Sequence, residues 1–557
     1  MPILNWIGKE QVVNHDKDVA FRLLNKDSKL STKEDSENLI IEGDNLEALK
    51  ALMPYYAGQV KCIYIDPPYN TGNEKWVYND RVNSPEIRKW LGKVVGSEGE
   101  DLNRHDKWLC MMYPRLKLLR DLLADDGVIF ISIDDAEIYN LRIILDDIFE
   151  EDNIIAVLPT VMNLKGNQDE FGFAGTHEYT VVYAKDKLRA KVKEFGLDEE
   201  EFEEWEEDEY GYFKKGANLK STGVNAPREK RQNLYFPVYI SDDNQIHIEQ
   251  KRKSDLKIYP ITDKKEMSWR WSKNKIAKES HNLIVIREGN TVSIYKKQRP
   301  GLGDLPSKKP KTIFYKPEYS SGNGTNQMKT IFGSKVFDNP KPLDLIKDLI
   351  SLVADSDDIV LDSFAGSGTT AHAVLELNKE DEEKGNRKFI LIQIPEEIKE
   401  DSTAYKAGFR QVIEVTRKRV EKVIDGVPTA KNERFKEGLG GGFQFMRLGT
   451  PLFDNEGFIS EDVTFKDMAQ YIYFTETKTA LNTRKIDGLF IGAKNDTEYY
   501  LLFKGIKKNI IDNKILKQIN KNHNPKVIYA DKCLVNKATL AKHKITFKQI
   551  PYEVKVY

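Results

Sequence analysis

The chain is poor in cysteine. Its 557 residues include three, Cys62, Cys110 and Cys533, and they lie far apart. Such a set provides neither a disulfide framework nor the closely spaced ligand pairs of a zinc site. The eight histidines are equally scattered. We therefore expect no metal centre built on His or Cys ligands, and a reducing environment.

Long apolar runs and a strong net charge are also missing. The longest apolar run, Val128–Ile133, has the length of a strand, whereas a membrane span needs about 20 apolar residues. No charged-then-apolar signal segment opens the sequence. We therefore expect a cytoplasmic protein with no membrane association. The formal charge is only −2, so a nucleic-acid surface would have to come from local clusters of Lys and Arg.

Short apolar runs alternate with helical patterns in two stretches of the chain, as expected of buried parallel strands joined by helices. The strand-like runs are Leu39–Ile41, Val60–Ile65, Gly127–Ile133, Ile359–Leu361 and Lys388–Ile394. The helical patterns are Asn45–Met53, Lys107–Leu123, Pro342–Val353, Thr369–Asn378 and Phe409–Ile424. Together they predict one doubly wound α/β sheet, in which ligands bind at the carboxyl ends of the strands.

Between these two stretches, residues 159–335 differ in composition. An acidic run, Asp198–Glu209, precedes two basic stretches, Gly211–Tyr235 and Lys296–Lys316, with interleaved aromatic residues. We expect the acidic run to form an exposed helix facing away from phosphate, or to pack against a basic face of another subunit. The basic stretches suit phosphate, and neighbouring Asn and Gln are among the side chains that bond to base edges. The candidate DNA contacts are Lys214, Lys215, Lys220, Arg228, Lys230 and Arg231.

The tetrapeptide Asp66-Pro67-Pro68-Tyr69 comes directly after the predicted strand Val60–Ile65. Its prolines restrict the turn and hold the Asp66 carboxylate and the Pro67 carbonyl in a fixed relation as two acceptors. Two converging acceptors suit an NH2 donor. Tyr69 offers a flat face for stacking a base taken out of a duplex. These four are the candidate catalytic residues. The alternative is a rigid loop in which the Asp caps a helix.

A second motif, Asp362–Thr370, follows the strand-like run Ile359–Leu361 and opens the next helix. Glycines at such a turn let the backbone approach a ligand closely. The motif lacks the lysine of a P-loop, and Ala371 stands where a dinucleotide fingerprint has its third glycine. The pattern Phe-x-Gly-x-Gly of methyltransferases fits each position. The candidate cofactor residues here are Asp362, Phe364, Ala365, Gly366, Ser367, Gly368 and Thr369.

The order of the two motifs, with Asp66 and Asp362 separated by 296 positions, leaves room for a domain between them. In this the sequence resembles the β-class amino-methyltransferases, where a recognition domain lies between the base-site motif and the cofactor motif. Within that class it is similar to the Mod subunits of type III restriction-modification systems. The segments that carry the likeness are Leu4–Lys9, Tyr64–Asn73, Trp108–Leu123, Asp126–Asp135, Leu361–Leu375, Arg387–Gln393 and Phe547–Pro551.

The resemblance implies a Rossmann-like, circularly permuted fold that uses S-adenosylmethionine to methylate an exocyclic amine of a base in double-stranded DNA. It favours N6 of adenine, because related enzymes acting on N4 of cytosine more often begin the first motif with Ser; cytosine is the alternative. Asp44, after Gly43, is expected to contact the cofactor adenine. Gln393 stands where many relatives carry an acid that binds the ribose, and Glu396 is the alternative for that role.

The resemblance also divides the chain. It implies a methyltransferase domain in two parts, residues 1–158 and 336–437, a target-recognition domain at 159–335, and a C-terminal α/β unit at 438–557 after the glycine-rich Gly438–Gly442. The C-terminal unit is expected to serve packing or assembly. We expect a prokaryotic, nucleoid-associated protein whose partners are DNA, a second copy of the chain, or a restriction (helicase-nuclease) subunit. The alternatives are an orphan methyltransferase, an inactive DNA-binding subunit, and an RNA or protein substrate.

Overall fold

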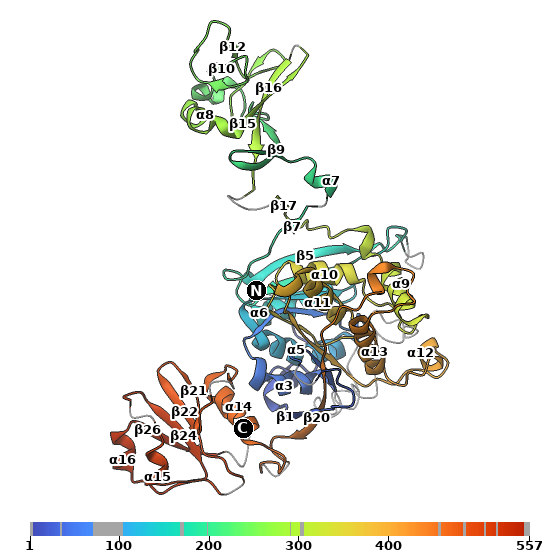
Figure 1. The fold of residues 1–557 in the computed structure, drawn as a ribbon, viewed down its shortest axis with the longest axis vertical. Coiled ribbons are helices and arrows are strands. Elements are labelled where there is room, and N and C mark those ends of the chain that lie inside the picture. Colours follow the sequence, from blue (N-terminus) through green and yellow to red (C-terminus); the bar gives the residue numbers. More distant parts are fainter. Residues whose placement is uncertain are drawn as a thin grey trace. The chain divides into compact units, whose positions relative to one another are not determined.

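The computed structural model describes residues 4–33, 36–70, 104–166, 172–197, 199–289, 291–300, 306–454, 458–482, 486–505, 508–519 and 522–550 (Figure 1). The chain forms two compact units. The main unit consists of Met1–Lys193 and Lys311–Tyr557, and the inserted unit is Glu194–Pro310.

The main unit is built on a nine-stranded sheet in the order β1-β20-β2-β19-β18-β3-β4-β6-β5. Neighbours from β20 to β4 run parallel, whereas β1, β6 and β5 pair antiparallel with theirs. The predicted doubly wound α/β sheet is thus confirmed. The strands are β1 (Arg22–Lys26), β2 (Leu39–Glu42), β3 (Val60–Ile65), β4 (Leu123–Ile133), β5 (Ile154–Val161), β6 (His177–Ala184), β18 (Ile359–Asp362), β19 (Lys388–Gln393) and β20 (Gln444–Pro451).

Helices cover both faces of this sheet because its central strands are apolar on both sides. Ile63 and Ile65 of β3 pack in the core with α3, α5 and α6, and alternation along the strand turns the buried Cys62 and Tyr64 to the other face. On that face α10 contacts β3 and packs against α11, which packs against α13. The main-unit helices are α3 (Asn45–Tyr56), α5 (Arg104–Leu122), α6 (Ile138–Phe149), α9 (Ser321–Phe332), α10 (Leu343–Ser351), α11 (Thr369–Glu380) and α13 (Val412–Asp425). Within the described ranges, no helix combines the length and the apolar content needed to cross a bilayer.

The inserted unit has its own core, which includes Leu219, Phe236 and Trp269. It is shorter than the predicted segment 159–335, because β5 and β6 belong to the main sheet and α9 packs against α13. Its larger sheets are β15-β16-β9-β8 and β11-β10-β12. The elements are β8 (Glu206–Asp208), β9 (Gly211–Asn218), β10 (Val238–Ile240), β11 (Ile246–His247), β12 (Leu256–Ile258), α8 (Lys273–Glu279), β15 (Leu283–Glu288) and β16 (Thr291–Gln298).

The prediction of one exposed helix over the acidic run Asp198–Glu209 is wrong. Asp198 lies outside the described residues, a short helix α7 spans Glu199–Phe202, and the run then forms β8, which pairs with β9. Asp208 on β8 forms ion pairs with Lys297 at 2.5 Å and Arg299 at 2.6 Å. The Arg299 guanidinium holds the pKa of Asp208 below its usual range. The acidic run is therefore partly neutralised by the second basic stretch of the same chain.

The C-terminal part also departs from its prediction. The strand β20, which follows Gly438–Gly442, lies inside the main sheet between β1 and β2. The Gly442 carbonyl accepts hydrogen bonds from Ser36 Oγ at 2.7 Å and Asn38 Nδ2 at 2.8 Å, so the glycine-rich segment is anchored and is not a free linker. A smaller sheet, β21-β22-β24-β26, follows α14, which packs against α3. These elements are α14 (Phe465–Thr477), β21 (Phe490–Lys494), β22 (Thr497–Leu501), β24 (Lys526–Ala530) and β26 (Ile545–Gln549).

Candidate active site

The two predicted motifs meet at one edge of the main sheet. Strands β3 and β18 are parallel neighbours, so Asp66 and Asp362, at their carboxyl ends, lie at the same edge. From this pair the chain continues to β4 on one side and to β19 on the other, which makes it the switch point where such sheets bind ligands.

A cavity of about 240 Å³ opens at this switch point. Of the predicted site residues, those that line it are Asp44, Asp66, Pro68, Asp362, Phe364, Ala365, Gly366, Ser367, Thr369 and Gln393. Pro67, Tyr69 and Gly368 belong to the same two turns but are not among the lining residues. The cavity therefore joins the first motif to the second.

Asp66 presents a buried acceptor to this cavity. Its Oδ1 lies 3.3 Å from the Lys341 ammonium, yet within the described part of the chain this oxygen has no hydrogen-bond partner. Burial raises the pKa of Asp66 to about 6, against the opposing effect of Lys341. A carboxylate oxygen held in this way can accept a hydrogen bond from a ligand group.

The turn that follows Asp66 is fixed from outside. Trp108 Nε1 on α5 donates to the Pro68 carbonyl at 2.7 Å. Asn70 adopts a left-handed conformation, with φ 59°, and its amide donates to the Arg104 carbonyl at 3.1 Å and to the fully buried Glu137 carboxylate. Residues 71–73, the end of the family-like segment, lie outside the described residues.

Lys341 and Glu178 complete the site, although neither was predicted. The Lys341 ammonium lies 2.7 and 2.8 Å from the two Glu178 oxygens and contacts the Tyr69 hydroxyl, which itself donates to Glu178 at 3.0 Å. Burial disfavours the ammonium, but Asp66 and Glu178 outweigh it and raise the pKa of Lys341. A weak signal was present, because Glu178 starts a predicted strand and Lys341 immediately precedes a predicted helix.

Asp362 shapes the second turn. Its carboxylate accepts from the Phe364 amide at 2.9 Å and from Thr370 Oγ1 at 2.5 Å. Burial raises the pKa of Asp362 to about 7. Next to it, the Ser363 hydroxyl is buried, lines the cavity and has no hydrogen-bond partner in the described ranges. The turn thus leaves a polar group available to a ligand.

Gly366 and Gln393 lock the glycine turn to the end of β19. The Gly366 amide donates to Gln393 Oε1 at 2.8 Å, and Gln393 Nε2 donates to the Ile394 carbonyl at 3.1 Å. Both polar groups of Gln393 therefore have partners within the protein. Glu396 also lines the cavity.

Asp44 holds the start of α3 at the cavity wall. Its carboxylate accepts from the Leu46 and Glu47 amides at 2.8 and 3.3 Å, and it pairs with the buried Arg115 at 3.1 Å. It therefore caps the helix and also lines the site, with 35% of its side chain exposed.

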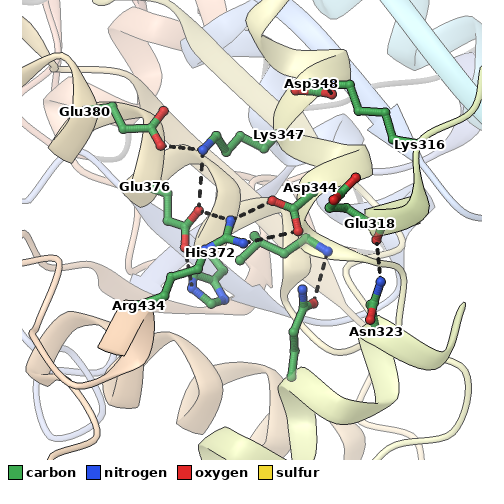
Figure 2. Close-up of polar contacts among 12 residues, drawn as sticks. Lys316, Glu318, Asn323, Asp344, Lys347, Asp348, His372, Glu376, Glu380 and Arg434 are labelled. Atoms are coloured by element: carbon green, nitrogen blue, oxygen red, sulfur yellow. Dashed lines mark hydrogen bonds and ion pairs between the residues drawn. The ribbon is translucent and has the colours of Figure 1, made fainter. Parts of the chain in front are cut away.

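Ion pairs clamp the helices behind the glycine turn. Arg434 lies between Asp344 of α10, at 2.8 Å, and Glu376 of α11, at 2.5 Å (Figure 2). Lys347 pairs with Glu380 and lies 3.8 Å from Glu376. These contacts hold α10 against α11. In the part of the chain that the structure describes, no group of three or more His, Cys, Asp or Glu residues is arranged to hold a metal ion.

The six candidate DNA contacts all lie in the inserted unit. Arg228 pairs with Glu266 at 2.8 Å and is exposed, as are Lys215, Lys230 and Arg231. Lys214 and Lys220 are half-buried. Their role in DNA binding stays a prediction.

Comparison with known proteins bears on this geometry. A family model described as DNA methylase matches residues 60–405, a range that contains both motifs and the inserted unit. The chain belongs to the DNA methylase family. The predicted relation of this methylase to type III Mod subunits is confirmed by its relatives. The type III restriction-modification enzyme EcoPI Mod subunit of Escherichia phage P1 is 45% identical over 457 residues, 78% of this chain and 70% of that one.

Two further relatives extend the comparison. The type II methyltransferase M.KpnI of Klebsiella pneumoniae is 33% identical over 411 residues, 73% of the methylase and 92% of that chain. The StyLTI Mod subunit of Salmonella typhimurium is 31% identical over 465 residues, 80% and 66% of the two chains. The methylase is a DNA methyltransferase with S-adenosylmethionine as its methyl donor. The cavity fits that donor, because the glycine turn, the unpartnered Ser363 hydroxyl and the Asp44 carboxylate all face it.

Proposed function

We propose that this methyltransferase modifies N6 of adenine at a specific site in duplex DNA, as the modification subunit of a type III-like restriction-modification system. The observation that carries the proposal is the Asp66 carboxylate, a buried acceptor with an unbonded oxygen, one strand away from the glycine turn.

Each side chain of the first motif has a separate task in this proposal. Asp66 and the Pro67 carbonyl accept the two hydrogens of the amine, which leaves the nitrogen lone pair free to attack. The Tyr69 ring stacks on the extrahelical base. Asp44, Gln393 and the turn from Asp362 to Thr369 hold S-adenosylmethionine, which supplies the methyl group.

The chemistry needs orientation more than a strong base. A bond forms between nitrogen and the methyl carbon as the bond from that carbon to sulfur breaks, and the amine then loses a proton to Asp66 or to water. Orientation of two reactants can lower the barrier by about 7–11 kcal/mol. The fixed turn around Pro68, held by Trp108, supports this role.

The decisive variant is Asp66→Ala. It should keep its affinity for S-adenosylmethionine and for duplex DNA but lose methylation, because one strong acceptor in a closed site contributes on the order of 3–4 kcal/mol to the barrier, by analogy with an oxyanion-hole donor. Methyl transfer to a duplex from tritiated S-adenosylmethionine measures the loss. A fully active Asp66→Ala protein would overturn the proposed mechanism.

The target base and site require a different measurement. Single-molecule sequencing of DNA from cells with and without this gene reports the modified base and its sequence context together. We expect N6-methyladenine at one asymmetric or palindromic motif. N4-methylcytosine at that motif would replace adenine by the alternative base.

We infer two assembly partners, a second copy of this chain and a restriction subunit, because three relatives are named as Mod subunits of restriction-modification enzymes. Light scattering of the purified chain tests the first partner. Co-purification with the product of an adjacent helicase-nuclease gene tests the second. A monomer without such a neighbouring gene would favour the orphan methyltransferase. A nucleoid location follows from DNA as substrate, and fluorescence microscopy of a tagged chain tests it.

A further inference from the structure

We propose that Lys341 and Glu178 are a positioning pair for the base-binding turn, and that they set the charge and orientation of its two functional side chains. The inference rests on the proposed function, since it takes Asp66 and Tyr69 as the groups that meet the base.

The geometry places the Lys341 ammonium at the centre of this pair. It lies 2.7 and 2.8 Å from the Glu178 oxygens, 3.3 Å from Asp66 Oδ1, and in contact with the Tyr69 hydroxyl. Only 9% of the Lys341 side chain and 13% of the Glu178 side chain are exposed. Removing such charges from water costs several kcal/mol per ion unless they are paired. This arrangement pairs the ammonium with two carboxylates and thereby couples their charges.

Lys341 also connects the two motifs. Its side chain faces the turn after β3, while its backbone carbonyl accepts a hydrogen bond from Thr369 Oγ1, at 3.3 Å, in the glycine turn. Glu178 reaches the site from β6, two strands away from β3. A single residue therefore joins the base-binding turn to the cofactor turn, and Glu178 braces it from the antiparallel side of the sheet.

The pair acts on Asp66 in opposite senses. Burial raises the pKa of Asp66, Lys341 lowers it, and Glu178 raises it. The charged and titratable groups that face Asp66 are Lys341, Glu178, Tyr69, Tyr64 and Asp362. Lys341 is the cation in that set. Because the ionised carboxylate is the form that accepts a hydrogen bond from the amine, loss of Lys341 should move the low-pH loss of activity to higher pH, and loss of Glu178 should move it to lower pH.

The test is the pH dependence of single-turnover methylation of a duplex, between pH 5 and 9, with saturating DNA and S-adenosylmethionine. In Lys341→Met the acid limb should move up by about one pH unit or more, which is about a tenfold rate loss per unit on that limb. Lys341→Arg should return the limb toward the wild-type position. In Glu178→Gln, which keeps the side-chain volume, the limb should move down.

Lys347→Met is the matched control. Lys347 is also paired with a glutamate, Glu380, but lies on α10 outside the cavity lining (Figure 2). Its acid limb and its rate should stay within twofold of wild type. A purely structural role for Lys341 would lower the amount of folded protein and leave the position of the limb unchanged.

The outcomes separate the inference from the function on which it rests. A fully active Asp66→Ala protein sinks the proposed roles in the base-binding turn. An inactive Asp66→Ala protein, with Lys341→Met and Glu178→Gln both at the wild-type limb or both moved in the same direction, sinks the positioning pair alone. If Lys341→Met does not fold, the direction of the shift in Glu178→Gln decides.

Discussion

Gly366 shows how one backbone position can define a binding turn. Its φ of 51° lies in the left-handed region, which is costly for a β-branched residue. Its amide donates to Gln393, and its carbonyl accepts from Thr416 Oγ1 at 2.6 Å. A side chain at this position meets both a strained conformation and the cavity.

We therefore expect Gly366→Val to abolish binding of S-adenosylmethionine in a folded protein, as measured by titration calorimetry. The control is Gly333→Val, because Gly333 has a φ of 78° and its added Cβ would meet no atom within 4 Å. That variant carries similar strain and should bind normally. Wild-type affinity in Gly366→Val would remove the glycine turn from the cofactor site.

Tyr69 combines a ring and a hydroxyl with separable contributions. Stacking on a base is worth about 1–3 kcal/mol, whereas the net contribution of the hydrogen bond to Glu178 is about 0.5–1.5 kcal/mol. Tyr69→Ala should thus weaken capture of the extrahelical base more than Tyr69→Phe does. A duplex with 2-aminopurine at the target position reports base extrusion by fluorescence, apart from chemistry. Equal loss in the two variants would assign the effect to the hydroxyl.

At the scale of elements, α13 supports the cofactor turn through one buried side chain. Arg419 is fully buried and donates to Ser367 Oγ at 2.9 Å and to Thr369 Oγ1 at 2.7 Å. Burial lowers the pKa of Arg419 to about 9. The helix therefore fixes the two hydroxyl groups that flank Gly368.

Replacing this arginine should loosen the turn without touching the base-binding motif. A hydrogen bond to a charged group contributes about 1.5–3 kcal/mol, so Arg419→Met should weaken S-adenosylmethionine binding by roughly 10- to 100-fold and lower the melting temperature. Arg417→Met, on the same helix but paired with Glu421 at its surface, should change neither. Calorimetry and thermal unfolding of both variants test this, and equal affinities in the two would refute it.

Elements with a local signal are the ones that the sequence predicts well. The strand β3 and the helix α5 match the predicted Val60–Ile65 and Lys107–Leu123 within three residues, because their apolar patterns are complete in themselves. The place of β20 in the main sheet is not predictable in that way. It depends on pairing with β1 and β2, more than 400 positions earlier, and the local glycine run suggests a linker.

The same distinction holds for the site. Asp66 and the glycine turn are visible in the sequence because each motif is contiguous and follows an apolar strand. Lys341 and Glu178 lie 163 positions apart, and only the strand order brings them together. Their charges, read singly, are those of ordinary surface residues, since such residues are seldom buried.

At the scale of the whole molecule, the inserted unit should carry site choice. Exchanging Glu194–Pro310 for the equivalent segment of a relative should change the methylated sequence and leave S-adenosylmethionine affinity intact. DNA binding should weaken as salt rises, in proportion to the phosphates neutralised, and most of that slope should move with the exchanged segment. Sequencing of methylated DNA and binding assays at several salt concentrations measure both effects. A chimera that kept the original site would place recognition elsewhere.

The pairing of β3 with β18 also has a consequence for synthesis on the ribosome. Val60 pairs with Ile359, about 300 residues later. At about 5–20 residues per second, β3 waits on the order of 15–60 seconds for its partner to be made. During that interval its apolar edge is open to wrong pairings, so the middle of the sheet closes late. Folding of this chain is therefore expected to be slow, and its yield to depend on chaperones that cover nascent strands.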